Sequence, residues 1–263
     1  RCYIITDLEG VVGVDQWRVT RTAEDDFDES ANAAAKAQLA REVNACVAGI
    51  HDAYPDATVD VLDGHGSGGL EPGALTDANY LRQPETDPLA ANDYDAMLYV
   101  GQHAMAGMPF APLNHTQSSL HREYYKLNGT FIGEFAGGAL RAGLAGVPTV
   151  YLAGDNKACL EAQMFVPEIA TTAVKWGEGV QAAQHRDPEA ACALIREDAR
   201  DAIQRIAEVP PLTGFSAPYT MEIRWVDPRD SVPDRFQAPS IDVEQIDERT
   251  FRIESEDFTD VYP

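Results

Sequence analysis

Short apolar runs alternate along this chain with longer segments in which apolar residues recur at helical spacing. The apolar runs predict strands at 2–6, 58–62, 96–101, 148–152 and 169–174, and the periodic segments predict helices at 30–53, 134–144, from about 156, and 187–207. Strands that alternate with helices are typical of a parallel sheet with helices on both faces. We therefore predict an α/β fold, a mostly parallel sheet in a three-layer arrangement.

Local signals fix two further features. Asp187 and Pro188 are preferred residue types at an N-cap and at the first helical position, so a helix should begin there. Asn128-Gly129 supplies the positive φ angles of a type I′ turn, which predicts a hairpin over 124–132.

The end of the chain has a different pattern. Pro210-Pro211 interrupts the helical period, and strand-like runs follow at 219–225 and 250–253 among many acidic residues. We predict an α/β core over residues 1–208 and a small, mixed, strand-containing extension over residues 209–263.

The net charge of the chain limits the classes of binding partner that it can have. With 43 Asp and Glu against 20 Lys and Arg, the formal net charge is −23, although 44% of the residues are hydrophobic, as in an ordinary globular protein. Nucleic acids and anionic membrane surfaces both require a basic face, so neither is expected as a partner. An acidic protein attracts cations, including metal ions, towards its clefts.

No segment is predicted to cross a membrane. The longest run without charged residues, 96–121, contains two prolines and three histidines, which indicates a strand followed by a polar loop. We expect a cytoplasmic protein. The chain begins at Arg1, inside a strand-like run, so this expectation leaves export open.

Acidic residues and histidines follow the predicted strands. Asp7 and Glu9 come after the first strand, Asp63 and His65 after the second, His103 after the third and Asp155 after the fourth. The carboxyl ends of parallel strands share one edge of a sheet, where ligands bind. Adjacent carboxylates repel one another unless a cation or a proton lies between them. Histidine with carboxylate is an ordinary zinc ligand set, and more than four such ligands suit a pair of metal ions.

Each of these signals is weak alone, because an Asp or His after a strand is more often a turn or capping residue. Their convergence carries the prediction. Three of the six histidines, His65, His103 and His115, lie in glycine-rich or charge-free loops. The other three, His51, His121 and His185, are assigned to helix ends or the surface.

Seven short motifs resemble those of the zinc-dependent D-aminopeptidase family, in the same order. They are Asp7-Leu8-Glu9-Gly10-Val11-Val12-Gly13, Glu42-Val43-Asn44-Ala45, Asp63-Gly64-His65-Gly66, Gly101-Gln102-His103-Ala104, Asn114-His115-Thr116, Ile132-Gly133-Glu134 and Ala153-Gly154-Asp155. The resemblance covers about residues 1–208 and is loose in the tail.

The resemblance implies a site. Its metal ligands would be Asp7, Glu9, His65, His103 and Glu134, with Asp7 bridging two zinc ions, and its catalytic histidine would be His115. Asp63 and Asp155 are not ligands in the family pattern, so we expect them to cap a helix or to support the ligands.

The resemblance also implies an activity. We expect an aminopeptidase that hydrolyses short peptides with an N-terminal D-amino acid through metal-activated water. His115 would pass a proton to the leaving amine or, in a second version, attack as a nucleophile. The preference for D-residues rests on the resemblance alone, as does the expectation of a ring-shaped homo-oligomer.

Two alternatives stay open. A dinuclear site also serves amidases and phosphoesterases. The loops at the predicted edge contain no cation to hold phosphate, and Arg122 and Lys126 are the nearest in sequence. The second alternative, a non-catalytic peptide-binding component of a transport system, would not need three histidines and three acids at one edge.

Overall fold

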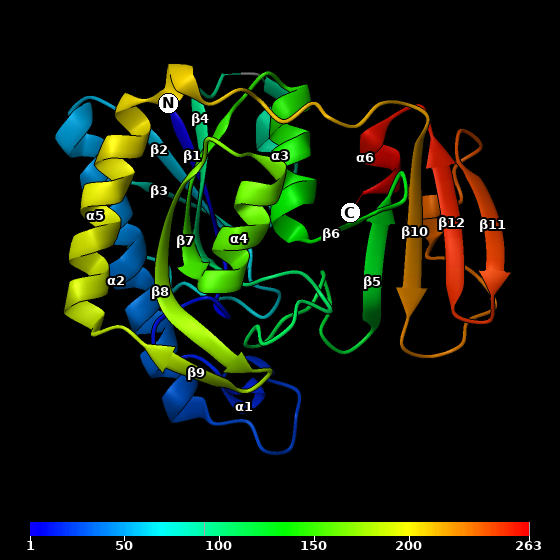
Figure 1. The fold of residues 1–263 in the computed structure, drawn as a ribbon, viewed down its shortest axis with the longest axis horizontal. Coiled ribbons are helices and arrows are strands. Elements are labelled where there is room, and N and C mark those ends of the chain that lie inside the picture. The colour runs from blue at the N-terminus through cyan, green and yellow to red at the C-terminus, as the bar shows by residue number, and fades with distance from the viewer. Residues whose placement is uncertain (92, 263) are drawn as a thin grey trace.

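The computed structural model describes residues 1–91 and 93–262. The larger of its two sheets has seven strands (Figure 1). The strand order is β3 (Asn79–Leu81), β2 (Val59–Asp63), β1 (Cys2–Thr6), β4 (Ala96–Gln102), β7 (Thr149–Asp155), β8 (Ala170–Gly179) and β9 (Ala182–His185). Each neighbouring pair is parallel except β8 and β9. The predicted mostly parallel α/β architecture is confirmed.

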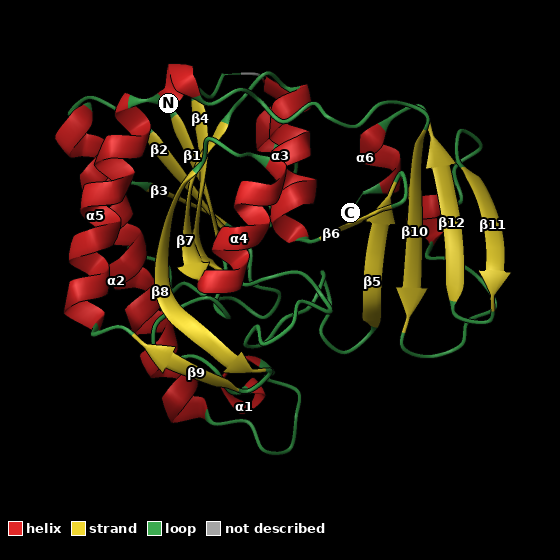
Figure 2. Ribbon diagram, viewed as in Figure 1, coloured by secondary structure: helices red, strands yellow, loops and turns green. Residues whose placement is uncertain are grey.

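Helices cover both faces of this sheet (Figure 2). On one face α2 (Glu29–Ala53) packs along α5 (Pro188–Gln204), and on the other lie α3 (Glu134–Leu144) and α4 (Asn156–Phe165). The side chain of Asp187 accepts hydrogen bonds from the first turn of α5, as an N-cap does. The expected start of that helix is therefore confirmed.

A second, antiparallel sheet lies beside the first. Its strand order is β11 (Asp242–Asp247), β12 (Thr250–Ser255), β10 (Tyr219–Trp225), β5 (Arg122–Leu127) and β6 (Thr130–Ile132). The predicted hairpin is β5 and β6, with positive φ at Asn128 and Gly129. Strands from the middle of the chain thus pair with strands from its end. The division of the chain at residues 208 and 209 stays a prediction.

Elements without a strong pattern were not predicted. They are β3, β9 and β11, the short helices α1 (Trp17–Thr20) and α6 (Phe258–Val261), and the 3₁₀ turns Pro88–Ala91, Ile206–Glu208 and Asp234–Phe236. The strand β11, for example, is exposed along its whole length, so burial leaves no apolar alternation in its sequence.

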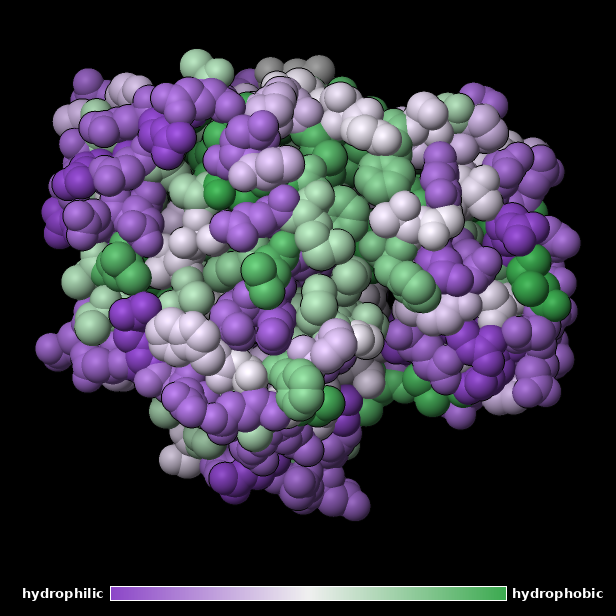
Figure 3. All heavy atoms as spheres, viewed as in Figure 1, coloured by the Kyte–Doolittle hydropathy of each residue, from purple (hydrophilic) through white to green (hydrophobic). Residues whose placement is uncertain are grey.

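Two hydrophobic cores share α3. The first fills the large sheet and its helices, and the second joins the antiparallel sheet to α6 and to two residues of α3, Ala136 and Leu140. On the face of the molecule shown in Figure 3, apolar side chains gather around α3 and α4, while hydrophilic side chains dominate the two ends of the long axis. None of the helices in the described ranges is long and apolar enough to span a bilayer.

Two buried ionisable side chains hold the loop that follows β1. Lys175 on β8 donates from Nζ to the backbone carbonyls of Glu9, Val11 (3.2 Å) and Val14. Glu42 on α2 accepts from Val12 N at 3.1 Å and from a glutamine one turn earlier. Both side chains are fully buried. The loop is thus fixed from two layers of the fold.

Glu42 predicts a pH dependence of stability. Burial raises its pKa to about 7, above the model-peptide value near 4.5. A carboxyl with a raised folded-state pKa stabilises the fold fully below the unfolded-state pKa and loses that contribution as pH rises through 7. Relative to Glu42→Gln, the wild type should therefore lose about 3 kcal/mol of unfolding free energy between pH 4.5 and 7.5. Urea unfolding at several pH values measures this difference, and parallel curves for the two proteins would contradict the assignment.

Candidate metal centre

Six of the residues singled out from the sequence lie together at the carboxyl edge of the large sheet. Asp7 and Glu9 follow β1, His65 follows β2 and His103 follows β4. Glu134 is the first residue of α3, and His115 lies in the loop between β4 and β5. They form two groups whose nitrogen and oxygen atoms converge within 4.8 Å, one of Asp7, Glu9 and His65 and one of His103, His115 and Glu134.

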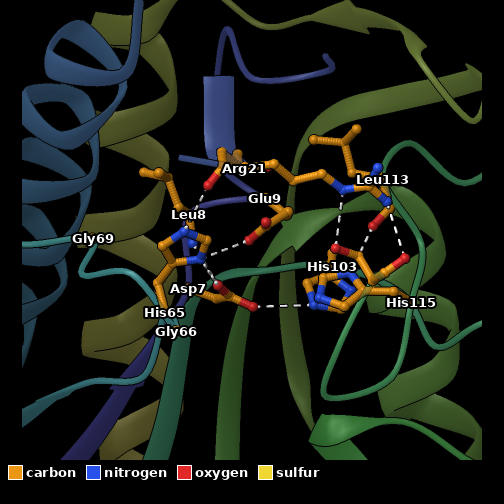
Figure 4. Close-up of polar contacts among 12 residues, drawn as sticks. Asp7, Leu8, Glu9, Arg21, His65, Gly66, Gly69, His103, Leu113 and His115 are labelled. Carbon is orange, nitrogen blue, oxygen red and sulfur yellow. Dashed lines mark hydrogen bonds and ion pairs between the residues drawn. The ribbon is translucent and has the colours of Figure 1, made fainter. Parts of the chain in front are cut away.

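Asp7 lies between the two groups (Figure 4). Its Oδ1 is 3.1 Å from His65 Nδ1, and its Oδ2 is 3.1 Å from His103 Nε2. Each ring nitrogen faces a second carboxylate as well. Glu9 Oε2 is 3.1 Å from His65 Nδ1, and Glu134 Oε1 is 3.4 Å from His103 Nε2.

Each histidine also places a ring nitrogen against a backbone carbonyl. His103 Nδ1 is 2.9 Å from Ala104 O, and His115 Nδ1 is 2.9 Å from Leu113 O. His65 Nε2 is 3.4 Å from a carbonyl in α1. A carbonyl only accepts, so these nitrogens carry the hydrogens. In the neutral rings the opposite nitrogens then turn lone pairs towards the carboxylates.

This donor set fits metal ions. Lone pairs that face carboxylate oxygens repel them unless a proton or a cation lies between. Within the described residues, Glu9 Oε2 and His103 Nε2 are buried and make no hydrogen bond, although both have polar neighbours at 3.1 Å. Carbonyls that orient ligating histidines through the other ring nitrogen are usual at metal sites.

The charges of the cluster shift its pKa values in opposite directions. Burial alone would raise the pKa of Glu134, but the adjacent His103 lowers it to about 2. Burial likewise opposes the charge of His65, yet Glu9 raises the pKa of His65 to about 11. In the absence of a metal, protons on the imidazoles therefore balance the buried carboxylates.

His115 differs from the other two histidines. Its ring stacks on that of His103, with centroids 3.9 Å apart, and its Nε2 is 3.7 Å from Glu134 Oε1. Burial and the nearby charge of His103 lower the pKa of His115. His115 is thus the imidazole of the cluster that stays neutral most readily.

Close backbone approach between the end of β4 and the loop after β1 places the ligands. Gly101 has φ of +79°, and a Cβ there would lie 2.0 Å from the carbonyl oxygen of Asp7. Gly10 N donates to Gly101 O at 2.7 Å. Only glycine at position 101 allows both this conformation and this contact.

Further buried carboxylates hold the loops that carry the histidines. Asp63 accepts from Gly69 N at 2.9 Å in the glycine-rich loop after β2. Asp155 caps α4 and accepts from Ala104 N at 3.1 Å, so the capping role expected for it is confirmed. Glu161 on α4 accepts from Met105 N at 2.6 Å, and burial raises its pKa to about 7.

The tail of the chain supports Glu134. Gln117 N donates to Glu134 Oε1 at 2.7 Å, and Gln117 Nε2 donates to the hydroxyl of Tyr262 at 3.0 Å. That hydroxyl lies 3.4 Å from the backbone carbonyl of Glu134. A Cβ at Gly137 would overlap the Tyr262 ring at 2.1 Å. The first turn of α3 is therefore shaped to receive Tyr262.

Four charged residues are among those at or beneath this site that sequence reasoning missed. Lys175 and Glu161 look like ordinary strand and helix residues, and only their burial reveals a role. Arg21 and Arg141 line the two cavities beside the ligands. Arg21 lies in the segment between β1 and α2, so the expectation that the loops at this edge contain no cation was wrong, and Arg141 lies on α3, seven residues after Glu134. No local sequence signal marks either arginine.

Comparisons with known proteins find similarity over most of the chain. A family model described as D-aminopeptidase matches residues 1–263. A D-aminopeptidase of Bacillus subtilis (strain 168) is 26% identical over 221 residues, covering 81% of this chain and 77% of that protein. The solved structure of the Zn-dependent D-aminopeptidase DppA from Bacillus subtilis, described as a self-compartmentalizing protease, has a TM-score of 0.83 at 21% identity. It covers 99% of this chain and 93% of its own.

The close approach at Gly101 predicts a large effect of Gly101→Ala. The change combines positive φ with a clash against the carbonyl of Asp7, so we expect a loss of about 3 kcal/mol or more in unfolding free energy. Gly129→Ala is the matched control, since φ there is +84° but a Cβ meets nothing within 4 Å. It should cost about 1 kcal/mol. Denaturant unfolding compares the two, and equal losses would refute the role of the contact.

Proposed function

This chain belongs to the D-aminopeptidase family, and on that premise we propose that it removes N-terminal D-amino acids from short peptides at a centre of two zinc ions. The observation that carries the proposal is the arrangement of the three histidines. Each places one ring nitrogen at a backbone carbonyl and turns the other towards a carboxylate. Such an arrangement prepares a cation site rather than a hydrogen-bonded core.

Zinc is the metal that the donor set and one structural relative favour. Imidazole and carboxylate ligands suit zinc, and the structural relative DppA is described as Zn-dependent. The two groups of ligand atoms, with Asp7 in contact with both, support two ions and a bridging role for Asp7. In this proposal the ligands are Asp7, Glu9, His65, His103 and Glu134. Bound zinc would supply Lewis acidity and lower the pKa of water.

Residues other than the metal ligands would transfer the proton and attract the substrate. His115 Nδ1 is committed to Leu113 O, which leaves Nε2 to receive a proton and to pass it to the leaving amine. Its stacking on His103 holds the His115 ring beside the metal ligands, although His115 need not be a ligand itself. The acidic surroundings attract the ammonium group of a peptide substrate.

We also propose that the chain works as a ring-shaped homo-oligomer. Support comes from the description of DppA as a self-compartmentalizing protease. The net charge of −23 opposes close packing of copies at low salt, so apolar contacts and counterions must offset that repulsion.

The dinuclear centre predicts a metal count. Protein purified without chelators and then supplied with zinc should hold about two zinc ions per chain by mass spectrometry. His65→Ala and Glu134→Ala should each lower the count, because each removes a ligand from one group. Glu168→Ala, an exposed acid on the surface, should leave it unchanged. No zinc on the wild type after supply would refute the centre.

The role of His115 predicts a separation of metal binding from turnover. His115→Ala should lower kcat about 10²- to 10⁴-fold on a D-aminoacyl peptide, while the zinc count stays at the wild-type value. His121→Ala, an exposed histidine, serves as the control. A zinc count that falls together with activity would instead make His115 a ligand. Unchanged turnover would remove it from the mechanism.

A further inference from the structure

Two cavities meet at the candidate ligands. Both are lined by Asp7, Gly64, Gln117 and Glu134. One, of about 340 Å³, also contains Arg21 and is named here the Arg21 cavity. The other, of about 360 Å³, contains Arg141 and is named the Arg141 cavity. A peptide cleaved at the ligands therefore has two directions in which to extend.

The Arg141 cavity runs along one face of α3. Glu134, Gly138 and Arg141 are spaced i, i+4 and i+7, which places them in a row on a helix. Gly138 contributes no side chain to this row, and a Cβ there would lie 2.0 Å from the hydroxyl of Tyr99. The helical rise separates the Cα atoms of Glu134 and Arg141 by roughly 10 Å. The cavity thus extends from a candidate ligand to a guanidinium, with Gly138 and Tyr99 in its lining.

The two arginines differ in what they have left to bind. Every guanidinium nitrogen of Arg21 has a partner, since Nε and Nη2 donate to Ser119 and Nη1 donates to Glu24. Its guanidinium also stacks on Trp17 at 3.8 Å. Arg141 uses only Nε, which donates to Asp87 Oδ2 at 2.8 Å. Across residues 1–91 and 93–262 its two Nη atoms have no hydrogen-bond partner.

Asp87 holds Arg141 in place through Nε and makes no hydrogen bond with its two Nη atoms. The second carboxylate oxygen of Asp87 accepts from Leu89 N at 3.0 Å, so both of its oxygens are engaged. The cavity wall beside this pair is largely apolar, with Ile5, Leu62 and Leu89 among its residues. An anchored guanidinium beside an apolar wall suits a ligand that is apolar along its length and ends in an anion.

We propose that Arg141 binds a carboxylate of the peptide substrate in the Arg141 cavity. This inference rests on the proposed peptidase function and deepens it. One extended residue spans about 3.5 Å, and helix side chains lean towards the helix N-terminus, here towards Glu134. A carboxylate one or two residues beyond the scissile bond is therefore within reach. The enzyme then selects short peptides with a free carboxyl end.

The test compares substrates that differ only in that carboxylate. With zinc-loaded wild type, kcat/KM for D-alanyl-glycine should exceed that for D-alanyl-glycinamide about 10- to 100-fold, because a charge-assisted hydrogen bond is lost in the amide. Arg141→Met should raise KM for the acid by the same factor and leave the amide unchanged. Arg141→Lys should recover part of the preference for the acid over the amide, since lysine keeps the positive charge but lacks the paired N–H donors of the guanidinium.

Controls separate this role from a structural one. Arg196→Met also breaks an Arg–Asp ion pair, at 2.6 Å to Asp52 on the outer surface, and should leave both substrates unchanged. Thermal unfolding checks that Arg141→Met is folded. Equal losses on acid and amide in that variant would make Arg141 a structural residue and overturn the inference. Equal rates on both substrates in the wild type would overturn it as well.

A binding measurement keeps this inference apart from the proposed function. Calorimetry on zinc-loaded His115→Ala should show tighter binding of D-alanyl-glycine than of its amide, and Arg141→Met in that background should abolish the difference. A wild type that hydrolyses neither peptide would refute the function, while calorimetry still decides the carboxylate site. Equal binding of acid and amide would overturn the site even in an active enzyme.

The source of the carboxylate is decided by a second pair of substrates. D-glutamyl-glycinamide and D-glutaminyl-glycinamide lack a terminal carboxylate and differ only in the side chain. No preference between them assigns the Arg141 cavity to the carboxyl end of the peptide. A preference for the glutamyl substrate that Arg141→Met removes would place an acidic first residue at Arg141 and overturn the assignment to the carboxyl end. A glutamyl preference that survives Arg141→Met would contradict binding of that side chain by Arg141.

Discussion

The buried contact of carboxylate oxygens with imidazole nitrogens at the sheet edge is the constraint on which the rest of this structure depends. Asp7 and Glu9 converge on His65, and Asp7 and Glu134 converge on His103. The repulsion between carboxylates that share a histidine is relieved by protons on the histidines or by cations between the groups. Such an arrangement does not stabilise the fold by itself. The surrounding structure must hold it, and the proposed metal ions would balance its charges.

The support comes from side chains that bind the backbone beneath the ligands. Lys175 and Glu42 hold the loop after β1, and Asp155 and Glu161 hold the loop after β4. These four residues lie on β8, α2, α4 and the β7–α4 junction, so helices on both faces of the sheet contribute. Each of the four binds main-chain atoms of these loops, and none is hydrogen-bonded to the side chain of a candidate ligand. A backbone fixed from beneath in this way is the preorganisation that a metal site requires.

The sequence predicted the fold and part of the site for a physical reason. Parallel strands end at one edge, so the residues after the strands, Asp7, His65 and His103 among them, could be placed together before any coordinates. Glu134 could not, because it follows a hairpin of the second sheet, and only the family resemblance pointed to it. Lys175, Glu161 and Arg141 lie within regular elements. Their importance depends on burial and on partners more than 50 residues away, which periodicity does not record.

The second sheet is best understood through what it does to α3. Its hairpin ends two residues before Glu134, and its core includes Ala136 and Leu140 from the same helix. The tail then returns Tyr262 to the first turn of α3, where it contacts Gln117 and the carbonyl of Glu134. One face of α3 thus packs on the second sheet while another carries Glu134 and Arg141 along the Arg141 cavity. Any shift of the second sheet would move a candidate ligand and the guanidinium together. The helix α3 therefore fixes the distance between the proposed ligand Glu134 and the proposed carboxylate site at Arg141, and both sheets hold this helix in place.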